Sequence, residues 1–133
     1  MGYDPKWVID GLLAKSSRPG HRSENVPIEI VESWIKKTKD MGINSIICFL
    51  AERQLNYYSE IPTGLLEYYK KSGFEVLHLP EKDYLSPPLS EETLKKAISG
   101  FEELEKPVLI HCSAGIDRTG FAITNILDKI SLS

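Results

Sequence analysis

The hydrophobic residues of this chain fall into short continuous runs that are separated by polar segments. Three runs, at residues 43–50, 74–79 and 107–111, have the length of strands, and the first of them has the apolar character of a strand that is buried on both faces. Near the N-terminus, two shorter runs flank Asp10 and Gly11, a dipeptide that favours a tight hairpin turn. The pattern therefore predicts an N-terminal hairpin and three further strands.

Between these strands, apolar residues recur at helical spacing. They predict helices over residues 27–40, 65–72, 90–101 and 121–130, with Ser90 as a plausible N-cap of the third. Strands and helices thus alternate, which predicts an α/β fold with a central, mainly parallel sheet flanked by helices. In such folds the reactive site usually lies where strand ends meet helix starts.

The composition fits one globular domain over residues 1–133, with 41% apolar and 26% charged residues. The formal net charge of −3 gives no global field that would attract nucleic acid or an anionic membrane, so we expect neither as a partner. Cys48 and Cys112 are too few for the disulfide framework of a small secreted protein. With no visible targeting signal, these features predict a cytoplasmic protein.

The segment at residues 108–120 carries the strongest chemical signal. Cys112 stands at a predicted strand end, and Arg118 follows six positions later at a predicted helix start. Backbone N–H groups in a tight loop and a first helical turn lack intrahelical partners, so they can converge on a tetrahedral anion. Gly115 allows this loop a conformation that a side chain would obstruct, and Arg118 can offer two parallel donors to phosphate oxygens.

The same positive environment favours an ionised thiol. Thiols at helix N-termini or beside cations ionise more readily than free cysteine, so we expect Cys112 to be a nucleophilic thiolate. Thr119 can donate its hydroxyl to the sulfur, which would make the thiolate a better leaving group in a second step. His111, at the end of the preceding strand, is expected to support the loop through hydrogen bonds.

The pattern His-Cys-x5-Arg-Thr at residues 111–119 resembles the active-site loop of protein tyrosine phosphatases. The order of the other features resembles the small dual-specificity branch: an early hairpin at residues 9–14, and a strand followed by Pro-x-x-Asp that ends at Asp83. The resemblance covers roughly residues 7–130. It implies a compact phosphatase fold and a cysteinyl-phosphate mechanism that needs neither a cofactor nor a metal.

The resemblance also implies roles for individual residues. Cys112 would be the nucleophile and Arg118 the phosphate clamp, while Asp83 would protonate the leaving oxygen and then activate water. The residues implied to bind the substrate phosphate are Ser113, Ala114, Gly115, Ile116, Asp117 and Arg118.

Asp117 leaves the identity of the acid open. Many members of the family carry a small or neutral residue immediately before the arginine, whereas some relatives that act on phosphoinositides share the Gly-x-Asp-Arg-Thr-Gly pattern seen here. Asp117 is therefore a second candidate for the proton transfer beside Asp83. The alternative is that Asp117 only caps the following helix or pairs with a surface cation.

The expected substrate is a phosphorylated protein or a small phosphomonoester. A phosphotyrosine or dual-specificity protein phosphatase is the leading interpretation. A phosphoinositide or nucleotide/RNA 5′-phosphate phosphatase is the alternative, and a phosphate-binding module without turnover is a third. The chain ends 21 residues after Cys112, which is short for the family. We therefore expect either an unusually compact domain or self-association that covers the exposed apolar surface.

Overall fold

One five-stranded sheet, in the order β1-β2-β5-β3-β4, organises the computed structural model, which describes residues 4–131. The strands are β1 (Lys6–Ile9), β2 (Leu13–Ser16), β3 (Ser45–Cys48), β4 (Glu75–His78) and β5 (Val108–His111). β1 and β2 form an antiparallel hairpin, whereas every other neighbouring pair is parallel. The predicted hairpin and the mainly parallel sheet are thus confirmed, although the strands are a few residues shorter than the apolar runs.

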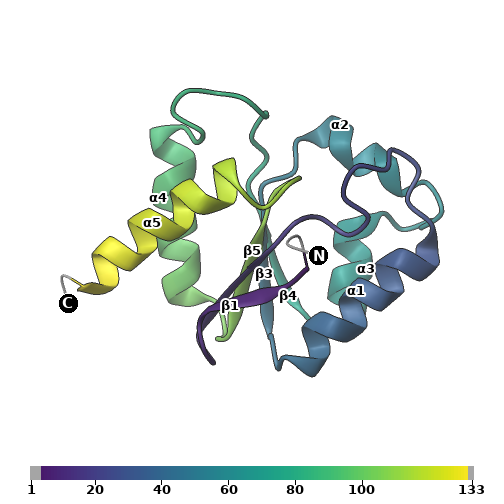
Figure 1. The fold of residues 1–133 in the computed structure, drawn as a ribbon, viewed down its shortest axis with the longest axis horizontal. Coiled ribbons are helices and arrows are strands. Elements are labelled where there is room, and N and C mark those ends of the chain that lie inside the picture. Colours follow the sequence, from purple (N-terminus) through teal and green to yellow (C-terminus); the bar gives the residue numbers. More distant parts are fainter. Residues whose placement is uncertain (1–3, 132–133) are drawn as a thin grey trace.

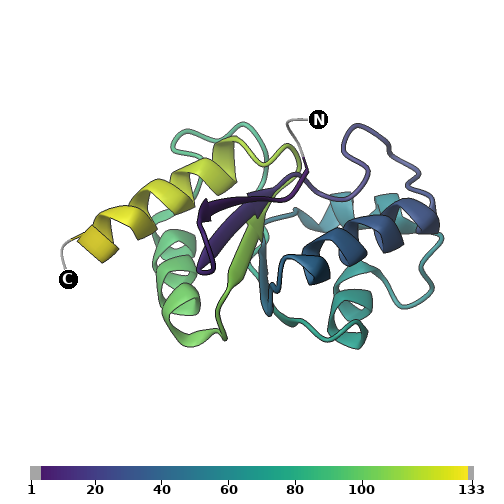
Figure 2. The same cartoon turned by 60° about the horizontal axis from the view of Figure 1, so that its bottom comes forward.

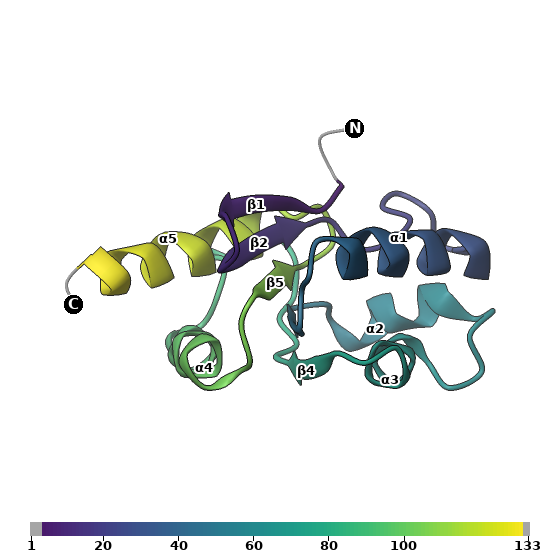
Figure 3. The ribbon, with the colours of Figure 1, turned by 90° about the horizontal axis from the view of Figure 1, so that it is seen from below.

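Helices cover both faces of the sheet. Their bounds are α1 (Ile28–Asp40), α2 (Glu52–Leu55), the 3-10 turn η1 (Asn56–Tyr58), α3 (Leu65–Lys71), α4 (Glu91–Glu103) and α5 (Asp117–Ser131). α1 and α3 lie against one face, and α4 and α5 lie against the other (Figures 1 and 3). Ser90 caps α4 as predicted, because its hydroxyl accepts a hydrogen bond from the Thr93 N–H at 3.1 Å.

The segment after β3 differs from the expectation of an irregular polar stretch. It forms α2 and η1, two short helical turns that follow each other directly. The sequence does not reveal these two turns, because only Gln54 and Tyr58 are buried and each turn is too short to show helical periodicity. This correction matters for the site, since α2 lies at the edge of the sheet where the candidate residues gather.

The core consists of two apolar layers on either side of the sheet. In the central strands, Ile46 and Leu109 point toward α1 and α3, while Ile47 and Ile110 point toward α4 and α5, and all four are fully buried. Successive strand residues face opposite sides, so a strand covered on both faces must be apolar throughout. This explains why β3 and β5, which are buried throughout, show no alternation.

Because β2, β3, β4 and β5 run parallel, their carboxyl ends lie at one edge of the sheet. The loops that leave β5, β3 and β4 therefore meet there, although they are distant in sequence (Figures 1 and 2). Within residues 4–131, no helix has both the length and the apolar character needed to cross a membrane.

Candidate active site

The loop that joins β5 to α5, residues 112–116, is here called the cysteine loop. It begins with Cys112, which is only 2% exposed. Gly115 has a φ of +75°, and a Cβ on it would lie 2.4 Å from the Ser16 carbonyl oxygen. Any side chain at this position would therefore be strained and would collide with the backbone at the end of β2. The loop is held tightly against β2 by this close approach.

His111 supports the cysteine loop from behind. Its Nδ1 lies 3.0 Å from the Cys112 carbonyl oxygen and its Nε2 lies 3.0 Å from the Tyr69 hydroxyl. A carbonyl can only accept, so Nδ1 carries the proton and Nε2 accepts from Tyr69. Burial lowers the pKa of His111 to about 4, which keeps the ring neutral and this pattern intact. The structure thus places His111 in the supporting position expected from the sequence.

Arg118 lies in the first turn of α5 and is 1% exposed. Its Nη1 donates to the carbonyl oxygens of Phe49, at 3.0 Å, and Glu81, at 2.6 Å, and to Oε1 of Gln54, at 3.3 Å. These acceptors follow β3 and β4. All three acceptors bind Nη1 and so fix the orientation of the guanidinium. Its Nε and Nη2 make none of these hydrogen bonds.

Apart from Nη2 of Arg118, which forms an ion pair with Asp83, two buried donors at this site have no hydrogen-bond partner within residues 4–131: Nε of Arg118 and Oγ1 of Thr119. A buried donor without a partner costs about 1–3 kcal/mol. Since both belong to the segment that begins with Cys112, the arrangement suits acceptor atoms that the protein alone does not provide. Oxygens of a bound oxyanion, and the sulfur of an ionised Cys112, are acceptors of this kind.

Asp83 reaches the same guanidinium from the segment after β4. Its Oδ1 forms an ion pair with Nη2 of Arg118, and its Oδ2 accepts a hydrogen bond from Nε2 of Gln54 at 2.7 Å. The side chain is 23% exposed, so one side of the carboxyl group remains open to solvent. The structure therefore brings Asp83 and Arg118 together.

Gln54 is the residue that sequence reasoning missed. It is 2% exposed, and its Oε1 accepts the Ala51 N–H at 2.9 Å. This bond fixes the orientation of the amide, so that Nε2 must point toward Asp83. A weak signal was available: Gln54 lies four residues after the apolar run that ends at Leu50, at the active edge of the sheet.

Asp117 occupies a different environment from Asp83. It is the first residue of α5 and is exposed, a position where a carboxylate interacts favourably with the helix dipole. Ser113 and Ala114 are half-buried in the cysteine loop, and Ile116, 59% exposed, lies at its rim. The contacts to Arg118 and Gln54 that hold Asp83 have no counterpart at Asp117 among the hydrogen bonds and ion pairs of the described residues.

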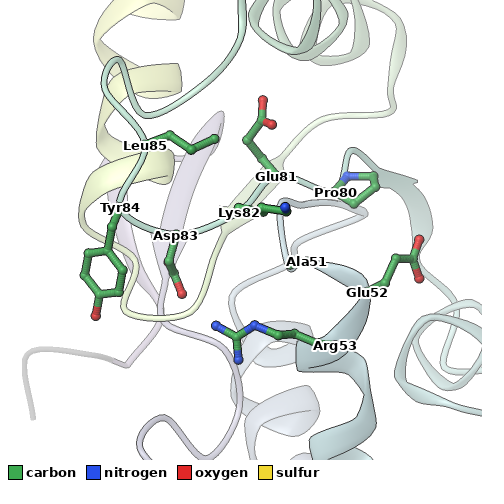
Figure 4. Close-up of a pocket in the computed structure, with 9 residues that line it drawn as sticks. All are labelled: Ala51, Glu52, Arg53, Pro80, Glu81, Lys82, Asp83, Tyr84 and Leu85. Carbon is green, nitrogen blue, oxygen red and sulfur yellow. The ribbon is translucent and has the colours of Figure 1, made fainter.

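A pocket of about 570 Å³ opens beside Asp83, between residues 51–53 and residues 80–85 (Figure 4). The Arg53 guanidinium extends toward Asp83, whereas the Glu52 carboxylate points away from it. Lys82 also lines the pocket. The space next to the candidate acid is thus open, and the cationic side chains of Arg53 and Lys82 line it.

Three tyrosines, Tyr57, Tyr58 and Tyr84, lie on the segments that surround the site, and their environments differ. Tyr58 is buried and donates its hydroxyl to the Pro19 carbonyl oxygen at 2.6 Å, so it is part of the core. Tyr57 accepts a hydrogen bond from Arg53 at 2.9 Å. Tyr84, 92% exposed, lies at the mouth of the pocket beside Asp83. Only Tyr57 and Tyr84 remain near the open part of the site.

Cys48 is fully buried in the core, where it packs as a small apolar residue. Burial raises the pKa of its thiol to about 12, so this cysteine stays protonated. Both cysteines are free thiols.

Comparison with known proteins gives a consistent result. The profile of a family described as "Polymorphic toxin system, DSP-PTPase phosphatase" matches residues 22–130, well over half of the chain. No curated protein matches the chain.

Solved structures share the fold. Tk-PTP in its active form has a TM-score of 0.66 and 26% identity, over 96% of this chain and 74% of that one. The core catalytic domain of the PP-IP phosphatase SIW14 from S. cerevisiae, in complex with citrate, has a TM-score of 0.68 and 22% identity, over 98% and 69%.

A third similar structure is the kinase-associated phosphatase, in a form whose catalytic-site cysteine is replaced by serine. It has a TM-score of 0.66 and 21% identity, over 86% of this chain. The chain spans 64% of the length of that protein.

Proposed function

The chain belongs to the DSP-PTPase phosphatase family of polymorphic toxin systems, and from this premise we propose that it hydrolyses phosphomonoesters of proteins through a cysteinyl-phosphate intermediate. One observation carries the proposal. The buried guanidinium of Arg118 is fixed by three acceptors on one side, while its Nε and the hydroxyl of Thr119 remain without partners beside Cys112. This is a preformed receptor for an oxyanion.

In the first step, the Cys112 thiolate attacks phosphorus and the bond from phosphorus to the leaving oxygen breaks. Arg118 and the backbone N–H groups of the cysteine loop hold the three non-bridging oxygens. Asp83, in its protonated form, gives its proton to the leaving oxygen, so the alcohol or phenol departs neutral. The products of this step are the free alcohol and a cysteinyl phosphate.

In the second step, water enters from the side that the alcohol has left. The Asp83 carboxylate takes a proton from this water, and the oxygen attacks phosphorus. The sulfur–phosphorus bond breaks, and the Thr119 hydroxyl donates a hydrogen bond to the departing thiolate. Inorganic phosphate leaves, and both Cys112 and Asp83 return to their starting states.

We assign the acid role to Asp83 rather than Asp117 on geometry. The Asp83 carboxylate contacts the phosphate clamp directly and borders the open pocket, where a leaving group can lie. Asp117 is exposed at the start of α5. Asp83 thus offers a carboxyl group on the side from which the alcohol must leave.

A protein substrate is the first choice, because the pocket beside Asp83 is open and partly apolar, with Pro80 and Leu85 in its wall. The second candidate is a substrate with a further acidic group, such as a phosphoinositide. Arg53 and Lys82 favour this alternative, because they line the same pocket as cations. We place the reaction in the cytoplasm, where thiols stay reduced, since a nucleophilic Cys112 must be a free thiol.

The test is hydrolysis of an aryl phosphate by the wild type, by Cys112→Ser, and by Cys48→Ala as a matched cysteine control. We expect activity in the wild type and the control, and a loss of at least about a thousandfold in Cys112→Ser. Turnover that survives in Cys112→Ser would disprove the assignment of the nucleophile. A panel of phosphotyrosine and phosphoserine peptides and phosphoinositides then separates the two substrate candidates.

A further inference from the structure

Arg18 is a second buried arginine beside the cysteine loop. It follows β2 and is 3% exposed. Its Nη2 donates to the Ser23 carbonyl oxygen at 2.8 Å, and its Nη1 is within 3.4 Å of the Gly20 carbonyl oxygen and 3.3 Å of the Tyr58 hydroxyl. The guanidinium also lies over the Tyr57 ring, 4.7 Å from its centroid.

Every acceptor of the Arg18 guanidinium is neutral. Within residues 4–131, no carboxylate forms an ion pair with it, in contrast to Arg118, which pairs with Asp83. An isolated charge in a low-dielectric interior is costly unless an opposite charge compensates it. The arrangement therefore retains a fixed positive charge whose counter-charge is not on any described side chain.

This charge is connected directly to the cysteine loop through Ser113, the residue after the candidate nucleophile. The Arg18 backbone N–H donates to the Ser113 carbonyl oxygen at 2.9 Å, and Arg18 Nε donates to Ser113 Oγ at 3.2 Å. The same charge already acts on a neighbour, because it contributes to the lowered pKa of His111. Arg18 is thus bonded to the residue that follows Cys112 and acts electrostatically on His111, the residue that precedes it.

We propose that Arg18 is a positioning residue that fixes the cysteine loop through Ser113 and supplies a second permanent positive charge for the Cys112 thiolate and the bound phosphate. The negative charge that compensates Arg18 is then that of the Cys112 thiolate and the bound phosphate. This inference rests on the proposed phosphatase function. It adds a residue that lies outside the His-Cys-x5-Arg-Thr pattern, 94 positions before Cys112 in the chain.

The other charged and titratable groups that face Cys112 must be considered in a test. They are Arg118 in α5, His111 in β5, Cys48 in β3 and Asp83 after β4. Substitution at Arg18 leaves each of these side chains in place, although it removes one contribution to the lowered pKa of His111. The variants are Arg18→Met, which removes the charge, and Arg18→Lys, which keeps it but loses the fork of donors. Arg22→Met is the control, because Arg22 lies exposed in the same loop.

The readout that requires no turnover is alkylation of Cys112 at neutral pH, located by mass spectrometry so that Cys48 does not contribute. Iodoacetate is an anion and iodoacetamide is neutral, so the ratio of their rates reports the local positive potential. We expect Arg18→Met to lower this ratio at least about fivefold, Arg18→Lys to lower it much less, and Arg22→Met to leave it nearly unchanged.

A second readout is protection of Cys112 from iodoacetamide by inorganic phosphate or vanadate. The concentration needed for half-protection should rise at least about tenfold in Arg18→Met. If Arg18→Met does not fold, Arg18→Gln replaces it, because an amide can still bond to the carbonyls of Gly20 and Ser23 without carrying charge.

Equal losses in Arg18→Lys and in the neutral variant would overturn the electrostatic part of the proposal, and unchanged ratios and protection would overturn it entirely. These results are separable from the phosphatase assignment. A wild type that binds vanadate at Cys112 without hydrolysing phosphoesters would refute the proposed function and still permit the test of Arg18.

Discussion

The two segments that supply the candidate nucleophile and the candidate acid differ in how they are held. The cysteine loop has Gly115 pressed against the backbone at Ser16, and both ring nitrogens of His111 are bonded beneath it. The acid segment, residues 80–89, is mostly exposed, and Tyr84 adopts a φ of +62° at its outer side. Both follow parallel strands at the same edge of the sheet.

The contacts of Glu81 and Asp83 explain the difference. Glu81 N–H donates to the Phe49 carbonyl oxygen at 3.2 Å, and the Glu81 carbonyl oxygen accepts from Arg118. Asp83 depends on Gln54 and, again, on Arg118. The proposed anion receptor is therefore held by packing, whereas the candidate acid is held by a few polar contacts, and Arg118 is the residue that both regions share.

Substitution of Arg118 should impair both the cysteine loop and the acid segment, because both contact it. We expect Arg118→Lys to lower kcat/KM on an aryl phosphate at least about a thousandfold, because one ammonium group cannot replace a fork that serves three acceptors and a phosphate. Arg53→Lys, on the pocket wall, is the matched control and should change little. A loss of less than tenfold in Arg118→Lys would mean that the clamp is unnecessary.

Substitution in the acid segment alone should affect chemistry without affecting phosphate binding. We expect Asp83→Asn to lower kcat about a hundredfold on a phosphate ester with a poor leaving group, and much less with a good one, because only the poor leaving group needs the proton. Asp117→Asn should change both rates little. The reverse order of the two variants, measured with the same pair of substrates, would move the acid role to Asp117.

Gln54 tests whether the acid depends on its polar support. Gln54→Met keeps the volume but removes the donor to Asp83 and the acceptor of Arg118. We expect kcat to fall about tenfold with a poor leaving group, while half-protection of Cys112 by vanadate changes less. Full activity in this variant would show that Asp83 finds its position without Gln54.

The smallest expected effect concerns stability and lies under the cysteine loop. The pKa of His111 is lowered from 6.5 to about 4 in the folded state. Between these two pH values the unfolded chain therefore binds a proton at His111 that the folded chain does not bind. Stability is therefore complete above 6.5 and falls as the pH drops toward 4, with a loss of about 1 kcal/mol between about pH 7 and about pH 5.5.

Denaturant unfolding at these two pH values measures the loss. His111→Gln keeps hydrogen-bonding groups at the same place but does not titrate, so its stability should change less over the same interval. An equal pH dependence in the two proteins would assign the acid sensitivity to other groups.

Much of the fold was predictable from local pattern. Apolar runs identified β3 and β5 because a strand covered on both faces must be apolar, and Asp10-Gly11 identified the hairpin. The half-buried edge strand β4 was recognisable as a run of strand length that Pro80 ends. The cysteine loop was predictable because nucleophile, glycine and clamp lie within seven consecutive residues. The short helical turns of α2 and η1 were not, since neither is long enough to show periodicity.

The sequence by itself determined the strands, the helices longer than one turn and the candidate anion receptor, because these depend on residues that are neighbours along the chain. Only the tertiary structure decided which carboxylate contacts Arg118. It also decided that Gln54 contacts Arg118 and that Arg18 contacts the cysteine loop. Those contacts join residues from 29 to 95 positions apart, across strands whose parallel alignment brings their ends together. Such proximity depends on the packing of the whole sheet, which no local pattern encodes.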